Sequence, residues 1–302
     1  MDGVLAVWKP EGWTSHDVVA KVRRIVRMKR IGHTGTLDPM VTGVLPLCLG
    51  RATRVVEYMQ ERPKSYEAVL KLGVATDTED MTGTVLEEQP VTGLSEYTVR
   101  EVLQRFLGEV EQVPPMYSAV KVDGKRLYEL ARAGQTVERK ARIVRIHDIS
   151  LLKTELDKNY PEIAFAVTCS KGTYIRTLCV DIGKALGVPA AMVKLVRTMS
   201  GGLTQADCLT IEQIEALHGS GELDKHLIAP DQAVSHLAEV TLSSQLAEKA
   251  LRGIKIAARD IVIPEHVQDG DIIRVYDQGR RFVGLFQNDR VNGRISPAKI
   301  FS

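Results

Sequence analysis

Apolar positions along the chain follow two spacings, which together predict both strands and amphipathic helices. Over residues 66–72 and again over residues 163–169, apolar side chains occupy every second position, the period of a strand with one buried face. Over residues 18–26 they recur every three or four positions, the period of a helix. Thr14 or Ser15 can cap the N-terminus of that helix. The pattern therefore indicates a protein that contains both kinds of element.

Glycine, proline and capping residues mark the ends of further predicted helices. These helices are expected over residues 99–107 before Gly108, over residues 125–132 before Gly134, and over residues 175–186 before Gly187 and Pro189. Thr210 and Gln213 form a capping box for another helix that runs through Leu217. Residues 138–146, between two of these helices, form a basic and strand-like segment.

The chain changes character beyond about residue 240. A helix-like stretch over residues 243–253 gives way to short apolar runs, which predict strands at residues 261–264, 271–277 and 280–286. Asp277, Gln278 and Gly279 are typical of a hairpin turn between the last two of them. We therefore predict two domains, residues 1–238 and a small β-rich module at residues 239–302.

The stretch from Ile31 to Leu49 combines a shaped loop with a buried strand. It opens with glycines and a proline, which shape the backbone, and then passes into an apolar run. His33 and two threonines lie in the loop together with one carboxylate, Asp38. A lone acid in this setting is a candidate for chemistry, but it is also typical of an aspartate that closes an Asx-turn. On spacing alone the turn is the more frequent case, so a chemical role needs further support.

The distribution of charge says more about partners than the total does. The formal net charge is +2, and 44% hydrophobic with 26% charged residues is ordinary for a soluble globular protein. Residues 21–30 hold six basic side chains and no acid, and residues 121–145 hold eight basic side chains against three acids. Such runs are usually solvated faces. Two of them flanking the candidate loop, in a nearly neutral protein, favour a phosphate-binding rim.

Several kinds of site lack their sequence signals. The four cysteines form no C-x-x-C pair and the seven histidines form no H-x-x-x-H pattern, so we expect buried reduced thiols and no metal site. There is no P-loop and no G-x-G-x-x-G motif, so no nucleotide cofactor is expected. No apolar run approaches the ~18 residues of a membrane helix, and no signal-peptide pattern follows Met1. We expect a cytoplasmic protein without a membrane partner.

Five segments in order resemble the TruB family of tRNA pseudouridine synthases. GHTGTLDPMVTGVLPLCLGRATR, from residue 32 to residue 54, is similar to the active-site segment of that family. WKPEGWTSHDVV resembles its Lys-Pro-x-Gly-x-Thr-Ser opening, although Trp8 stands where an acid is expected. The other three segments are KSYEAVLKLGVATDTED, PPMYSAVKVDGKRLYELARAG and SKGTYIRTL. The likeness covers nearly the whole chain, and several long matches in order are far more specific than one.

The resemblance implies both a fold and an activity. The fold is α/β (α+β), with a catalytic domain on a mixed, mostly antiparallel sheet and a small PUA-like RNA-binding domain at the C-terminus. The activity is conversion of uridine to pseudouridine at position 55, in the T-arm (TΨC loop) of tRNA. The N1–C1′ bond breaks, the uracil turns, and it rejoins through C5, without redox change. We therefore expect the T-arm stem-loop as partner, no cofactor, and a monomeric enzyme.

The resemblance also assigns three catalytic residues. Asp38 is the essential carboxylate, and Arg176 pairs with it. A guanidinium fork favours the charged form of a partly desolvated carboxylate and fixes its orientation. Tyr66 stacks on the target base, since an aromatic face can hold a base that has left its helix. From the residues alone, Arg176 could equally be a surface ion pair and Tyr66 a core aromatic.

Four further residues are assigned to substrate binding. His33 helps to flip the base or fills the space that it leaves, and Leu195 packs under it, which is compatible with a core position. Tyr174 supports the Asp38–Arg176 pair, and Lys9 belongs to the Lys-Pro opening. The family also has a mobile element, in the region of residues 125–146, that closes over RNA; the sequence alone shows a basic insertion there.

Two functions from other classes remain open. A carboxylate glycoside hydrolase needs a second acid ~5–10 Å from the first, and Asp38 has no obvious partner. A non-catalytic protein that binds or folds tRNA could use the same basic faces, and such binding could also be a second role. Whether Asp38 attacks C1′, adds to the uracil or removes a ribose proton is also open. Release of tritium from C5 of labelled uridine in tRNA separates the three functions.

Overall fold

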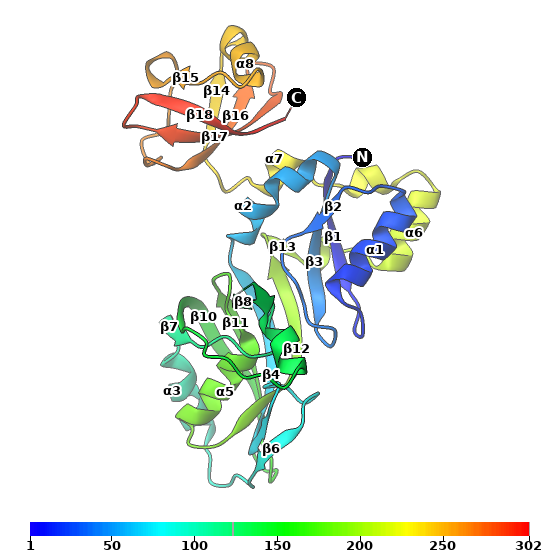
Figure 1. Ribbon diagram of the computed structural model, residues 1–302, viewed down its shortest axis with the longest axis vertical. Coiled ribbons are helices and arrows are strands. Elements are labelled where there is room, and N and C mark those ends of the chain that lie inside the picture. Colours follow the sequence, from blue (N-terminus) through cyan, green and yellow to red (C-terminus); the bar gives the residue numbers. More distant parts are fainter. Residues whose placement is uncertain (123, 302) are drawn as a thin grey trace.

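The computed structural model describes residues 1–122 and 124–301, and it contains two main sheets (Figure 1). The larger sheet has nine strands and the C-terminal one has five. Most strand pairs are antiparallel, so the predicted mixed α/β class with a mostly antiparallel sheet and a C-terminal β module is confirmed. Within the described residues, no helix is both long enough and apolar enough to cross a membrane.

The nine strands of the large sheet come from residues 3–204. They are β1 Gly3–Lys9, β2 Ile31–His33, β3 Thr42–Leu49, β4 Lys64–Leu72, β7 Gly108–Gln112, β10 Arg142–Glu155, β11 Glu162–Cys169, β12 Ala190–Ser200 and β13 Leu203–Thr204. Their order is β1-β3-β12-β4-β11-β10-β7, with β2 beside β3 and β13 beside β12. In this sheet β3 and β12 form the parallel pair, at Thr42 with Val196 and at Gly43 with Arg197.

Helices and short hairpins cover and connect these strands. The helices are α1 Ser15–Val26, α2 Val56–Gln60, α3 Glu96–Gln104, α4 Leu127–Arg132, α5 Ile175–Ala185, α6 Ile211–Gly219, α7 Pro230–Ala233 and α8 Ser244–Leu251. Two small hairpins pair β5 Val74–Thr76 with β6 Val85–Glu88, and β8 Lys121–Val122 with β9 Lys125–Arg126. Figure 1 shows α1 beside α6 on one flank, and α3 and α5 against the lower half of the sheet.

Local signals placed several of these elements correctly. Thr14 caps α1, because its hydroxyl accepts a hydrogen bond from the Asp17 N–H at 3.0 Å. The predicted capping box of Thr210 and Gln213 starts α6. α4 begins at Leu127 rather than at residue 125, because the two preceding residues pair with β8 instead.

Two apolar clusters support the two halves of the large sheet. One packs α3 and α5 against β4, β11 and β12, and the other packs α1 and α6 against β1 and β3. The predicted alternation in β4 has its physical reason here, because Tyr66, Leu70 and Leu72 face the first cluster.

The C-terminal module has five strands, of which three (residues 239–242, 256–257 and 294–300) were not predicted, and it lacks one strand that was predicted. Its strands are β14 Glu239–Leu242, β15 Ile256–Ala257, β16 Ile272–Asp277, β17 Phe282–Asp289 and β18 Arg294–Ile300. The strand predicted at residues 261–264 is wrong: Val262 is 87% exposed, and β15 takes the edge position beside β18. The predicted hairpin turn between β16 and β17 is present: it closes between Asp277 and Arg281, with Arg280 at positive φ (65°).

The C-terminal module shares a buried cluster with residues that precede it in the chain. Leu285 and Phe301 from the module pack in one cluster with Val55, Met59 and Val234. Lys299 also forms an ion pair with Glu57 at 2.8 Å. The domain boundary at residue 238 stays a prediction, and a chain cut there would remove Leu285 and Phe301 from this shared cluster.

Candidate active site

The loop between β2 and β3 presents Asp38 to solvent, and α5 brings Arg176 to it. The Asp38 carboxylate lies 3.2 Å from an Arg176 guanidinium nitrogen. The Asp38 side chain is 48% exposed, whereas that of Arg176 is 8% exposed. A turn at Gly172, which has a φ of 80°, reverses the chain after β11, so Arg176 falls in the first turn of α5. The carboxylate therefore faces outward while its cationic partner lies behind it.

The guanidinium of Arg176 is fixed on every side. One terminal nitrogen donates to the Thr78 carbonyl at 2.9 Å, and the other donates to the Tyr117 carbonyl at 2.7 Å. Asp80 lies 3.7 Å away as a second carboxylate. A planar fork with several fixed acceptors has one orientation, so the position of the Asp38 carboxylate is also defined.

Asp80 was not predicted at the site. The sequence indicates only a polar turn over residues 76–83, and this turn proves to hold Arg176 from behind. Asp80 is itself fixed by the hydroxyls of Thr78, at 2.8 Å, and Thr82, at 2.5 Å. Its side chain is 15% exposed and lies on the other guanidinium nitrogen, so it does not offer a second acid beside Asp38.

The N-terminal residues hold the backbone of the Asp38 loop. The Pro39 carbonyl accepts hydrogen bonds from the Lys9 ammonium at 3.1 Å and from the Gly12 N–H at 2.9 Å. The Ser15 hydroxyl accepts from the Leu37 N–H at 2.9 Å. The residues on both sides of Asp38 are therefore tied to β1 and to the start of α1.

Lys9 lies under the loop rather than on a surface that RNA can reach. Its side chain is fully buried, and its ammonium also donates to the Pro10 carbonyl at 2.8 Å. Burial lowers the pKa of Lys9 to about 8, and the nearby charge of Asp38 opposes that shift. The sequence placed Lys9 among the substrate-binding residues; the geometry gives it a role in supporting the loop.

Arg197 in β12 is a second residue that the sequence did not single out. It is 1% exposed, and its guanidinium donates to the Val44 carbonyl at 2.8 Å and to the Gly35 carbonyl at 3.0 Å. Gly43 allows the backbones of β3 and β12 to lie close together, because a Cβ on residue 43 would lie 2.2 Å from the Arg197 carbonyl oxygen. The sequence shows only a charged residue within an otherwise strand-like stretch. This pattern does not reveal which groups Arg197 contacts.

Tyr66 and Leu195 form the apolar floor beside the loop. They belong to one buried cluster with Leu37 and Val41, which flank Asp38 in the chain, and each is 8% exposed. In the β4–β12 register, Tyr66 lies opposite Arg197. Burial raises the pKa of Tyr66, and the guanidinium of Arg197, hydrogen-bonded to it, opposes that shift.

His33 lies at the start of the loop with a defined ring orientation. Its Nδ1 accepts a hydrogen bond from the Gly35 N–H at 3.3 Å, and its ring meets that of His16 edge-on at 5.7 Å between centroids. Burial lowers the pKa of His33, so the imidazole is neutral at pH 7.

Tyr174 is held through its backbone. The side-chain amide of Gln112 donates to the Tyr174 carbonyl at 3.3 Å and accepts from its N–H at 3.0 Å. Within residues 1–122 and 124–301, no hydrogen bond joins the Tyr174 hydroxyl to Asp38 or Arg176. Gln112, which was not predicted, therefore fixes the residue from which α5 begins.

The described residues offer no metal centre, since no group of three or more His, Cys, Asp or Glu side chains could hold an ion in this part of the chain. Burial raises the pKa of the Cys48 thiol to about 12 and that of Cys169 to about 11, which disfavours their thiolates. Cys208 departs from the prediction of buried thiols, because it is only half-buried. The chemistry that the site can offer is that of one oriented, exposed carboxylate above an aromatic and aliphatic floor.

Comparisons with known proteins match the chain along most of its length. Residues 23–175 match the TruB family pseudouridylate synthase N-terminal domain, and residues 176–235 match the tRNA pseudouridylate synthase B C-terminal domain. The chain is 47% identical to tRNA pseudouridine synthase B of Bacillus licheniformis over 304 residues, covering 99% of this chain and 97% of that protein. It is 44% identical to the protein of the same name from Geobacillus thermodenitrificans, with full coverage of both.

Solved structures show the same fold. A Cbf5–Nop10–Gar1 complex contains a chain that superposes with a TM-score of 0.79 at 28% identity, covering 99% of this chain and 85% of that one. An H/ACA RNP bound to a substrate RNA containing 2′-deoxyuridine gives a TM-score of 0.77 at 25% identity, again covering 99% and 85%.

Proposed function

The chain belongs to the TruB family of pseudouridylate synthases and isomerises uridine to pseudouridine in tRNA, and we propose that it does so at uridine 55 in the T arm with Asp38 as the essential carboxylate. The T-arm stem-loop is then its RNA partner. We further propose that the enzyme acts as a monomer in the cytoplasm, where tRNA is modified.

The observation that supports Asp38 is its exposure in front of a buried, fixed cation. Among the two carboxylates on Arg176, Asp38 is the exposed one and Asp80 is shielded behind the guanidinium. A charged carboxylate in this position can attack an electrophilic carbon or accept a proton. Either action needs a defined direction of approach, which the Arg176 fork supplies.

The isomerisation balances without any added group. The N1–C1′ bond of uridine breaks, a C5–C1′ bond forms, the proton of C5 leaves to solvent, and N1 ends protonated. Asp38 serves this exchange by attacking C1′, by adding to the uracil, or by removing a ribose proton. All three routes place the target base over Tyr66 and Leu195, and a neutral His33 lies beside the path by which the base enters.

Two basic surfaces fit the phosphates of the T arm. The face of α1 carries Arg24 and Arg27, both exposed, and the segment 121–145 carries Lys125 and Lys140, also exposed. Asp123, which belongs to that segment, lies outside the described residues. The start of α1 contacts the Asp38 loop through Ser15, and Tyr117, four residues before the second surface, accepts from the arginine that pairs with Asp38. A bound stem-loop can therefore present one base to the carboxylate while its backbone contacts both surfaces.

The replacement Asp38→Asn tests this proposal, because asparagine has nearly the same shape but is neither a carboxylate nucleophile nor a base. Tritium release from C5-labelled uridine in a tRNA transcript should fall by at least ~10⁴-fold, the upper range for one acid–base group. Affinity for the same tRNA should change little, because phosphate contacts dominate binding.

Asp157→Asn is the matched control, since Asp157 is an exposed aspartate in the turn between β10 and β11. It should release tritium at the wild-type rate. A transcript labelled at C5 of every uridine, with cytidine in place of uridine 55, should release no tritium. Near-normal release by the Asp38→Asn protein would end the proposal for Asp38, and continued release with the altered transcript would end the proposal for the site.

A further inference from the structure

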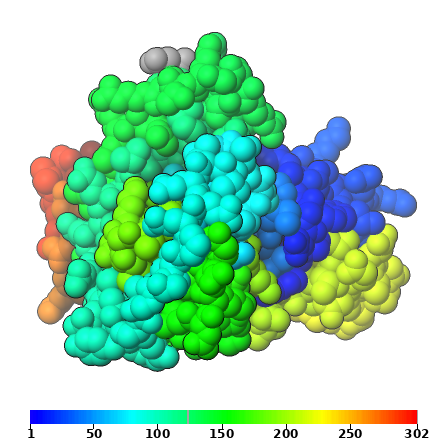
Figure 2. Space-filling model, turned by 90° about the horizontal axis from the view of Figure 1, so that it is seen from below, coloured from blue at the N-terminus to red at the C-terminus, as the bar shows by residue number. Residues whose placement is uncertain are grey.

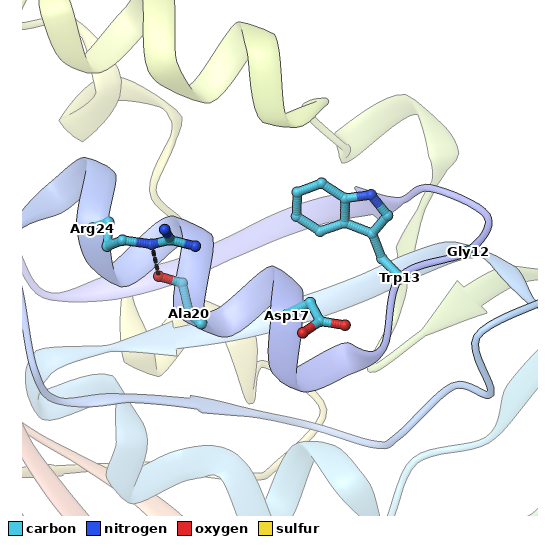
Figure 3. Close-up of a pocket in the computed structure, with 5 residues that line it drawn as sticks. All are labelled: Gly12, Trp13, Asp17, Ala20 and Arg24. Carbon is cyan, nitrogen blue, oxygen red and sulfur yellow. Dashed lines mark hydrogen bonds between the residues drawn. The ribbon is translucent and has the colours of Figure 1, made fainter.

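A surface hollow of about 280 Å³ lies along α1 and includes no residue of the Asp38 loop (Figure 3). Trp13 stands at one end, Asp17 and Ala20 lie along the floor on α1, and Arg24 lies at the other end. The floor residues are separated by helical spacings, so Asp17 and Arg24 lie about 10 Å apart along the helix axis. The hollow therefore has an aromatic end and a cationic end with a carboxylate between them.

These side chains have unused bonding capacity. Within the described residues, the Trp13 indole N–H has no hydrogen-bond acceptor and no carboxylate forms an ion pair with Arg24. The Arg24 guanidinium makes one long hydrogen bond, 3.4 Å, to the Ala20 carbonyl of its own helix. One oxygen of Asp17 accepts from the Thr14 N–H and hydroxyl at 2.8 and 2.6 Å, which leaves the other oxygen available.

We propose that this hollow binds one unpaired nucleobase of the tRNA, other than the base that is isomerised, with its ring stacked on Trp13 and its flanking phosphate on Arg24. Stacking on an aromatic side chain suits any unpaired base, and a guanidinium suits a phosphate. The free oxygen of Asp17 accepts from an amino or imino group on the edge of the base. A carboxylate there also repels phosphate, so it directs the backbone toward the Arg24 end.

Two contacts connect this hollow to the site of chemistry. The Gly12 N–H donates to the Pro39 carbonyl, one residue from Asp38, and the ring of His16 on α1 meets that of His33. Gly12 and His16 lie on either side of Trp13 in the chain, so we expect an RNA that covers Asp38 to come close to Trp13. The inference rests on tRNA as the substrate, but it requires neither Asp38 as the catalytic group nor position 55 as the target.

Intrinsic fluorescence can test the stacking directly, because the chain contains two tryptophans, Trp8 and Trp13. In the Trp8→Phe protein, Trp13 is the sole tryptophan, and titration with an unmodified tRNA transcript should quench the tryptophan emission along the binding curve. In the matched Trp13→Phe protein, emission from Trp8 in β1 should change much less. Absence of quenching in the Trp8→Phe protein at saturating tRNA overturns the proposal.

Affinity gives a second readout that does not depend on fluorescence. Trp13→Ala should weaken tRNA binding by about 5- to 150-fold, the range for removing the stacking partner of one base, while Trp13→Phe should keep most of the affinity. Circular dichroism and thermal melting must show that both variants fold. Equal affinity of a folded Trp13→Ala protein and the wild type contradicts the stacking.

RNAs with single abasic positions identify the base. A set of T-arm stem-loops is made in which each RNA lacks one unpaired base. For most of them the wild type should bind more tightly than Trp13→Ala. For the RNA that lacks the base held by Trp13, the two proteins should have equal affinity. If no abasic RNA removes the difference, Trp13 does not hold a base and the proposal fails. Tritium release by the wild type is measured in parallel, so failure of the catalytic proposal is recorded separately from failure at Trp13.

Discussion

The Asp38 loop and residues 113–141, which include most of the basic segment 121–145, are held in opposite ways. The loop backbone is bound from β1, from α1 and from β12, through Lys9, Ser15 and Arg197. In the segment, taken over residues 113–122 and 124–141, one hydrogen bond reaches the rest of the described chain, from Arg176 to the Tyr117 carbonyl. Figure 2 shows this segment in green at the top, standing out from the surface.

Under the proposed function, the difference separates two tasks. A carboxylate that must meet one atom of a base gains from a fixed position, and the loop supplies it with buried cations and carbonyl acceptors. A surface that follows a phosphate backbone gains from exposed charge, and the segment supplies it with Lys125 and Lys140. Arg176 connects the Asp38 loop with the segment, because the same guanidinium pairs with Asp38 and donates to the Tyr117 carbonyl.

The largest effect is expected on stability, from Arg197→Met. Methionine can fill the space but cannot donate, so the buried carbonyls of Gly35 and Val44 are left without their partner. The free energy of unfolding should fall by about 2–4 kcal/mol, measured by urea denaturation. Arg145→Met, an exposed change in β10, should stay within about 0.5 kcal/mol of the wild type. If both variants unfold at the same urea concentration, Arg197 does not hold the loop.

The next effect is expected on turnover, from Arg176→Lys. Lysine keeps the charge but cannot reach Asp38 and the carbonyls of Thr78 and Tyr117 together. Single-turnover tritium release should fall by about 100-fold, with tRNA affinity within a few-fold of normal. Arg100→Lys, in the exposed ion pair with Glu96, is the control and should have normal turnover. Normal turnover in Arg176→Lys would place this arginine outside the catalytic machinery.

A smaller effect is expected on the salt dependence of binding. Lys125→Gln with Lys140→Gln should lower the slope of log affinity against log salt by about 0.7–0.9 for each phosphate that these lysines neutralise. These lysines are cleaner probes than Arg23 and Arg139, which donate to the carbonyls of Ile31 and Pro114.

The matched control for this pair is Lys153→Gln with Lys158→Gln, at the ion pairs around Glu155. An equal slope for both double variants would make the segment an ordinary solvated surface.

The smallest effect is expected from pH, through the buried Lys64. Its ammonium donates to the carbonyls of Gln60 and Arg62, and burial lowers its pKa from 10.5 to about 8. As pH approaches the lower value, the folded chain gives up this proton while the unfolded chain keeps it, so stability rises with pH. The stability difference between wild type and Lys64→Met should shift in favour of the wild type from pH 7 to pH 8. No shift between pH 7 and pH 8 would show that the folded protein retains this proton as the unfolded chain does.

Elements specified by neighbouring residues could be predicted from the sequence. The caps at Thr14 and Thr210 and the alternation in β4 depend on spacings of two to four residues, and the structure has them as expected. The run at residues 261–264 was predicted as a strand because it is apolar, but a strand also needs a partner, and the edge beside β18 is taken by β15. Pairing is decided by the fold, which the local pattern does not contain.

The candidate site divides in the same way. Family resemblance located Asp38 and Arg176, and the structure places them in contact. The resemblance did not reveal Arg197 or Asp80, because their roles arise from contacts between distant parts of the chain. The resemblance also made Lys9 a substrate-binding candidate. In the structure Lys9 is buried, because the folded loop brings the Pro39 carbonyl to its ammonium.

The bonds from Arg197 to the loop also constrain when the site can exist during synthesis. They join residues 153 and 162 positions apart in the chain. Contacts of such high sequence separation form late, because a long segment must be ordered before they can close. A nascent chain that has emerged only as far as α5 already carries Asp38 and Arg176 but lacks β12 and the support under the loop. The enzyme therefore completes its catalytic geometry only after about two thirds of its length has left the ribosome.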